Sequence, residues 1–76
     1  MQNMIKELKQ RIERNYKIIQ INYEDICDLI KPVLEAINLL LLVNASDERI
    51  KIYLKSVSGS IKIIEEKLSI IEKNKK

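Results

Sequence analysis

The sequence predicts an all-α protein, either an antiparallel helical hairpin or a small helical bundle with a coiled-coil-like heptad seam. Three observations predict this class. Apolar residues recur every three or four positions, the 76 residues include only one Gly and one Pro, and 46% of residues are hydrophobic while 33% are charged. Strand hairpins and collagen-like chains need many more turn residues or glycines. A chain of this length is expected to form one domain, residues 1–76.

Two apolar stripes mark the helical regions, which we place at residues 3–43 and 47–73. The first stripe is Ile5, Leu8, Ile12, Tyr16, Ile19, Tyr23, Ile26, Ile30, Val33, Ile37 and Leu40. The second stripe is Ile50, Leu54, Val57, Ile61, Ile64, Leu68 and Ile71. Between them, Asn44 suits the end of one helix, and Ser46 or Asp47 suits the start of the next. We therefore expect a turn at residues 44–47.

The first helical region offers two places for a kink or a break. Pro32 lacks an amide hydrogen and restricts Lys31 before it, yet the apolar stripe keeps its phase on both sides. Asn22, with Asp25 three residues later, suits the start of a new helix. One kinked helix and two shorter helices both fit this pattern.

The middle of the chain has more apolar surface than a hairpin can cover. Its additional apolar residues are Ile18, Ile21, Leu29, Ala36, Leu39, Leu42 and Val43. A helix of this kind needs neighbours on more than one side, and small domains bury a low fraction of their surface. We therefore expect the chain to associate with itself, as a homodimer or a higher oligomer, and so to complete a helical bundle. The alternative is a closed three-helix monomer with breaks near Asn22 and Asn44.

The composition removes most catalytic and cofactor-binding chemistry. The chain has no His and one Cys, so it lacks imidazole-activated nucleophiles and the usual zinc sites. Its lone Gly59 cannot build the glycine-rich loops that hold phosphates. We expect Cys27 to be a small buried hydrophobe, and its lack of a disulfide partner favours a reducing, cytoplasmic location. No cofactor and no enzymatic activity are expected.

One carboxylate cluster, Glu24, Asp25 and Asp28, has the helical spacing with which two acids can hold Mg²⁺. It superficially resembles the first metal-binding motif of the all-helical nucleotide pyrophosphatases. That family also carries a second Glu-x-x-Asp motif, and the nearest segment here starts at Glu35 and ends in Asn38. We therefore expect no metal site and interpret the cluster as a solvated acidic face.

The formal net charge of +3 is unevenly distributed. Residues 1–17 and 44–76 are each net basic, whereas residues 18–43 are net acidic. Part of this pattern can be internal complementarity, and Glu7 with Arg11 forms a helix-spaced pair. Charges interrupt both the first residues and the most apolar stretch, so we expect neither a secretory signal nor a membrane span.

The second helical region carries a further, narrower apolar stripe, which is our candidate partner-binding surface. It consists of Ile52, Ile63 and Ile70, rimmed by Lys55, Lys62 and Lys67. The small residues Ser56, Gly59 and Ser60 nearby would let another backbone come close. We therefore predict a non-enzymatic protein–protein interaction module. The 15 Ile, 11 Lys and 6 Asn are typical of an AT-rich genome, which favours a small phage-like regulator or inhibitor of a host protein.

Two alternative functions remain open. A small basic nucleic-acid-binding bundle would use phosphate contacts from both ends of the chain, namely Lys6, Arg14, Lys17, Lys73, Lys75 and Lys76. Against it, acids dilute these basic residues, and the tyrosines lie on or beside the apolar stripes, away from any basic run where bases could stack. A further alternative is a sequestering binder of a small anionic ligand, held by lysines and tyrosines between protomers.

Overall fold

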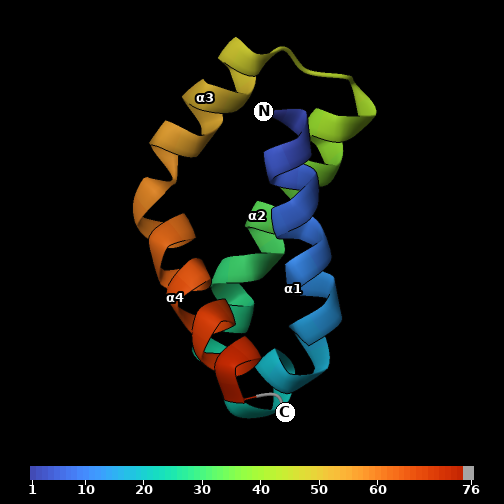
Figure 1. Cartoon of the computed structure of the whole chain (residues 1–76). Helices are drawn as coiled ribbons and strands as arrows, with labels where there is room; N and C mark the ends of the chain where they lie inside the picture. The colour runs from blue at the N-terminus through green and yellow to red at the C-terminus, as the bar shows by residue number, and fades with distance from the viewer. Residues whose placement is uncertain (75–76) are drawn as a thin grey trace.

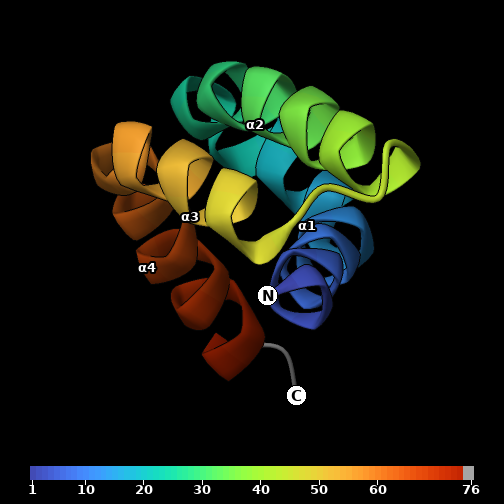
Figure 2. The same cartoon turned by 90° about the horizontal axis from the view of Figure 1, so that it is seen from above.

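A computed structural model describes residues 1–74, which form helices joined by short junctions. The helices are α1 (Gln2–Asn22), α2 (Glu24–Leu42), α3 (Asp47–Ser56) and α4 (Ser58–Asn74). Helices α1 and α2 run antiparallel, and α3 and α4 lie together on one side of this pair (Figure 1; Figure 2). The predicted all-α class is confirmed for these residues, with four helices where the apolar pattern predicts two helical regions.

The break in the first helical region lies at Tyr23, next to the position Asn22 that the sequence offers. The Tyr23 amide still donates to Ile19 at 2.8 Å, and the Tyr23 carbonyl accepts from the amides of Ile26 and Cys27, both at 3.1 Å. The chain therefore turns at a single residue, which brings α2 back along α1.

Pro32, the other candidate break, lies inside α2. Its side chain is exposed, and the neighbouring stripe residues Ile30, Val33 and Ile37 are all buried. Burial of a large aliphatic side chain is worth about 1.5–3 kcal/mol, so three such residues together offset the helix hydrogen bond that a proline removes. The helix consequently continues through the proline.

The junction between α2 and α3, residues 43–46, overlaps the segment expected to turn, residues 44–47. Asn44 has a φ of 53°, a left-handed conformation that Asn tolerates better than most residues. The Ala45 amide donates to the Leu40 carbonyl at 2.9 Å, which satisfies one of the free carbonyls at the end of α2. Ser46 then caps α3, because its hydroxyl accepts a hydrogen bond from the Arg49 amide at 3.4 Å. This junction reverses the chain and directs α3 back over the core.

The second helical region also breaks, at Val57, where the apolar pattern runs on without a slip. The Val57 amide donates to Tyr53 at 3.2 Å, and the Val57 carbonyl accepts from the Ile61 amide at 2.9 Å. Hydrogen bonds between residues four apart thus run across the junction. Helices α3 and α4 therefore form one bent arc, with its outer side facing away from α1 and α2 (Figure 1).

The core lies between the α1–α2 pair and this arc. Every residue of the two apolar stripes is buried or half-buried. The side chains with the least exposure come from all of the helices: Ile5, Ile12, Asn15, Ile19, Ile30, Ile37, Ile50, Ile64 and Leu68. A single chain thus encloses a core of its own. None of the helices within residues 1–74 combines the length and the apolarity needed to cross a lipid bilayer.

Candidate functional site

The outer side of the α3–α4 arc carries a continuous row of exposed residues, which we call the α3–α4 stripe. It consists of Ile52, Ser56, Gly59, Ile63, Glu66 and Ile70. Steps of four and three residues alternate along it, the spacing of residues on one helix face. The hydrogen bonds across Val57 keep α3 and α4 in phase, so the two helices present one surface.

The three isoleucines of the stripe are those that the sequence singles out as candidate partner-binding residues. Their exposed fractions are 65% for Ile52, 42% for Ile63 and 44% for Ile70. An isolated exposed isoleucine is ordinary on a protein surface, but a row of them on one face is typical of a binding surface. The structure therefore places all three on the solvent side of the arc.

The predicted lysine rim is divided between two environments. Lys55 and Lys62 are exposed beside the stripe, as expected for a rim. Lys67 is half-buried, and its Nζ lies 5.6 Å from the centre of the Tyr23 ring, within the range of a cation–π contact. Lys67 therefore also ties α4 to the junction between α1 and α2.

A second apolar surface, which we call the α2 end patch, consists of Leu39, Leu42 and Val43. Their exposed fractions are 60%, 81% and 55%. The sequence marks all three as additional apolar residues of the middle segment, but it does not show which of them the chain itself covers. They lie three and four residues apart at the end of α2, so they share one helix face.

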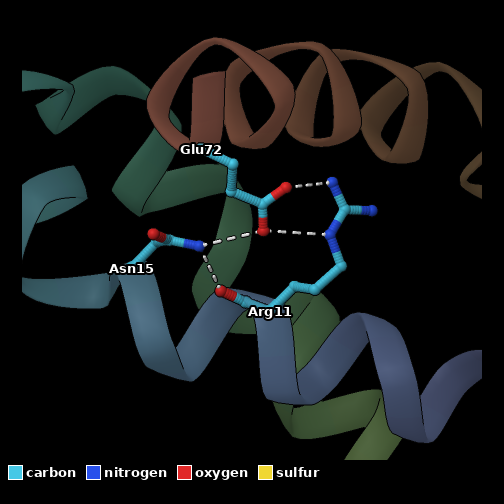
Figure 3. A network of polar contacts seen from close by, with 3 residues as sticks. All are labelled: Arg11, Asn15 and Glu72. Carbon is cyan, nitrogen blue, oxygen red and sulfur yellow. Dashed lines mark hydrogen bonds and ion pairs between the residues drawn. The ribbon is translucent and has the colours of Figure 1, made fainter. Parts of the chain in front are cut away.

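A polar network joins α1 to α4 on the inner side of the arc (Figure 3). The Arg11 guanidinium donates to both carboxylate oxygens of Glu72, with Nη2–Oε1 at 2.8 Å and Nε–Oε2 at 3.2 Å. The buried Asn15 amide donates to the Arg11 carbonyl at 2.8 Å and to Glu72 Oε2 at 3.3 Å. Among the described residues, the buried Asn15 carbonyl oxygen has no hydrogen-bond partner.

The network shifts the titration of both charged members. The hydrogen bond from Arg11 lowers the pKa of the Glu72 carboxyl, and the hydrogen bond from Asn15 adds to this effect. The hydrogen bond with Glu72 correspondingly raises the pKa of Arg11. An ion pair of this kind holds two helices together, and none of its members is a nucleophile or a base poised near neutral pH. We therefore assign the network a structural role.

The lone cysteine lies in the core, as the sequence predicts. Cys27 is buried, and its thiol donates to the Tyr16 hydroxyl at 3.5 Å. This hydrogen bond is the main cause of a raised pKa for Tyr16, and burial alone raises the pKa of Tyr53. Both tyrosines, like Tyr23, are half-buried.

The acidic residues Glu24, Asp25 and Asp28 are exposed at the start of α2. Within residues 1–74, no group of three or more acidic, Cys or His side chains is arranged to hold a metal ion. A shallow hollow at the same place brings Tyr23 and Lys67 together with Glu24 and Asp25. The two carboxylates make this hollow a poor site for a small anionic ligand.

The candidate phosphate-binding residues do not form a continuous basic surface. Lys6, Arg14 and Lys17 are exposed on α1, and exposed Glu7 and Glu13 lie among them. Lys73 is exposed near the end of α4, while Lys75 and Lys76 lie outside the described residues. The chain has two other arginines, Arg11 and Arg49. Arg11 forms an ion pair with Glu72.

Comparison with protein-family models, with curated proteins and with solved structures finds no match to this chain.

Proposed function

We propose that this protein is a non-enzymatic protein–protein interaction module that binds proteins, a second copy of itself included, through its exposed apolar surfaces. The observation that carries the proposal is how the exposed apolar side chains are grouped. Six of the eight large hydrophobic side chains exposed in residues 1–74 belong to the α3–α4 stripe or to the α2 end patch. Exposed apolar groups that share a helix face are the anchors by which helical proteins recognise partners.

The chemistry of the chain supports a regulator or inhibitor. Without histidine, these residues act most simply by occupying the surface of another protein. The composition, typical of an AT-rich genome, favours a mobile element that targets a host protein. The mixture of acidic and basic residues on α1 weighs against the nucleic-acid alternative, because phosphate binding requires a net basic surface.

Site-specific photocrosslinking in cells that express the full chain tests this function. A photoreactive residue replaces Leu42 in one variant and Ile63 in a second, and a control variant carries it at the exposed Glu13 of α1. We expect defined protein adducts from position 42 or 63, competed by excess unlabelled protein, and none from position 13. Adducts with nucleic acid, or equal diffuse labelling from all three positions, would overturn the proposal.

A further inference from the structure

We propose that the α3–α4 stripe is the docking surface for a second copy of this chain, held antiparallel by a two-fold axis that passes beside Val57. This inference rests on the proposed function and names one of its partners. Three features indicate that the partner is a second copy. They are a glycine that the fold of the chain does not require, an order of residues that is complementary to itself, and exposed charges on or next to the stripe that form no ion pair within residues 1–74.

The glycine is Gly59, in the second position of α4. Its φ is not positive, and a Cβ added to it would meet no side chain or neighbouring helix of residues 1–74 within 4 Å. Glycine in a helix interior costs roughly 0.5–1 kcal/mol relative to alanine, and even in this first turn alanine or leucine is the better helix former. The backbone at Gly59 is bare toward solvent, beside the small Ser56 and Ser58. The backbone of another molecule could therefore pack closely against the chain at this point.

The order of residues along the stripe is complementary to itself. An antiparallel copy related by an axis between Val57 and Ser58 places Ile52 opposite the partner's Ile63, and Ser56 opposite the partner's Gly59. Each contact then occurs twice, as two-fold symmetry requires. Small residues meet at the centre, and an isoleucine pair flanks them on each side. The alternating steps of three and four residues are those of antiparallel helix seams.

The bend of the arc places these residues where two copies would touch. The outer side of the arc is convex, and its bend lies at Val57 (Figure 1). Two convex helices come closest near their bends, where the small Ser56 and Gly59 lie, and only long side chains reach across farther out. Ile52 and Ile63 follow about one turn away on either side, near enough to be covered once the backbones approach.

The same register pairs opposite charges at its ends. Arg49 comes opposite the partner's Glu66, and both residues are exposed and free of ion pairs within residues 1–74. Lys55 and Lys62 flank the stripe on one side, so antiparallel docking also brings Lys55 near the partner's Lys62. Two attractive pairs and two repulsive pairs respond to salt in opposite directions. The affinity of the dimer should therefore depend little on salt.

Sedimentation equilibrium on the full chain tests the docking. We expect a monomer–dimer equilibrium whose dissociation constant rises about 100-fold in Ile63→Asp, because each dimer loses two contacts worth about tenfold each. Ile21→Asp is the matched control, the same change at a more exposed isoleucine outside both apolar surfaces, and should leave the dissociation constant unchanged.

Gly59→Leu distinguishes close approach of the two backbones from association driven only by exposed apolar surface. Leucine is a good helix former and has open space at this position, so the thermal midpoint of the monomer should rise. The dimer should nevertheless weaken at least about tenfold, because the new side chain separates the two backbones. A dimer that strengthens in Gly59→Leu, as added apolar surface alone would cause, would contradict the proposal.

A charge exchange tests the register. Arg49→Glu and Glu66→Arg should each weaken the dimer by about tenfold, and the double variant should regain most of that loss. Glutamate at position 49 is compatible with the start of α3, because it completes a capping box with Ser46. A wild-type chain that remains monomeric, or single and double variants that weaken additively, would overturn the inference. Protein crosslinks from position 42 would in that case still support the proposed function.

Discussion

Arg11 and Glu72 lie 61 residues apart in the chain and form a two-point ion pair, with Nη2–Oε1 at 2.8 Å and Nε–Oε2 at 3.2 Å. Helix spacing alone would pair Arg11 with Glu7, on its own helix. The long-range pair instead joins α1 to the last turns of α4, and the buried Asn15 donates to the same carboxylate. This contact fixes the end of the arc against the α1–α2 pair.

Removing the Glu72 charge should make stability less sensitive to acid. Because the folded state lowers the pKa of Glu72 below its ordinary value of 4.5, its contribution is complete above that value and is lost as the pH falls through the lowered pKa. We expect Glu72→Gln to cost about 1 kcal/mol at neutral pH, with the difference from wild type vanishing in acid. Urea unfolding as a function of pH measures this. Glu13→Gln is the exposed control. A cost for Glu72→Gln that stayed constant from neutral to acid pH would show that the Glu72 charge does not contribute to stability.

A second carboxylate beside Glu72 should destabilise the fold. In Asn15→Asp the amide that donates to Glu72 Oε2 at 3.3 Å becomes an acid of like charge. We expect a loss of about 2–3 kcal/mol in the free energy of unfolding at neutral pH, shrinking in acid as the buried group is protonated. Chemical denaturation at two pH values measures it, with the exposed Asn3→Asp as the control. Equal stabilities of Asn15→Asp and wild type would show that the two groups do not interact.

Trimming one methylene from the core should have a cost that depends on position. Ile30 is fully buried in α2, whereas Ile21 is 70% exposed at the end of α1. We expect Ile30→Val to lower the free energy of unfolding by about 1 kcal/mol and Ile21→Val to change it by less than about 0.5 kcal/mol. Thermal and urea unfolding of both variants measure these changes. Similar costs at the two sites would argue against the packing of α2 described here.

Replacing the proline inside α2 should stabilise the chain. Pro32 is exposed, so its ring fills no core space, and it removes a backbone hydrogen bond from the middle of a helix. We expect Pro32→Ala to raise the free energy of unfolding by about 1–3 kcal/mol, read from the urea midpoint. Glu35→Ala, an exposed change one turn later, should have little effect. A loss of stability in Pro32→Ala would show that the proline is needed where it stands.

Much of the fold follows from the sequence because apolar spacing reports burial directly. Ile30, Val33 and Ile37 keep their spacing across Pro32, and all three are buried. The α2–α3 junction is predictable as well, because Asn44 tolerates a positive φ and Ser46 provides a cap. Local chemistry and the apolar pattern agree at these positions.

The remaining features depend on contacts that one sequence does not reveal. Gly59 and the serines around Val57 weaken a helix without forbidding it, so the sequence permits a bend at Val57. The apolar stripe runs on there without a slip, so it does not require one. The burial of Asn15 had a usable signal, since Asn15 lies three residues after Ile12 and four before Ile19, both of which are buried. The isoleucines of the α3–α4 stripe were identifiable as a second face. The exposure of the α2 end patch was not predictable, because the sequence of an apolar helix end does not show whether other helices cover it.

The most direct test of the account is the solution mass of the purified full chain, measured by light scattering over a range of concentrations at low and high salt, with absorbance recorded for nucleic acid. Apolar association through the exposed surfaces predicts a mass approaching twice the 8.9 kDa of one chain, free of nucleic acid and nearly the same at both salt concentrations. A mass of one chain at every concentration would contradict self-association through these surfaces, and bound nucleic acid that only high salt removes would contradict the proposed function.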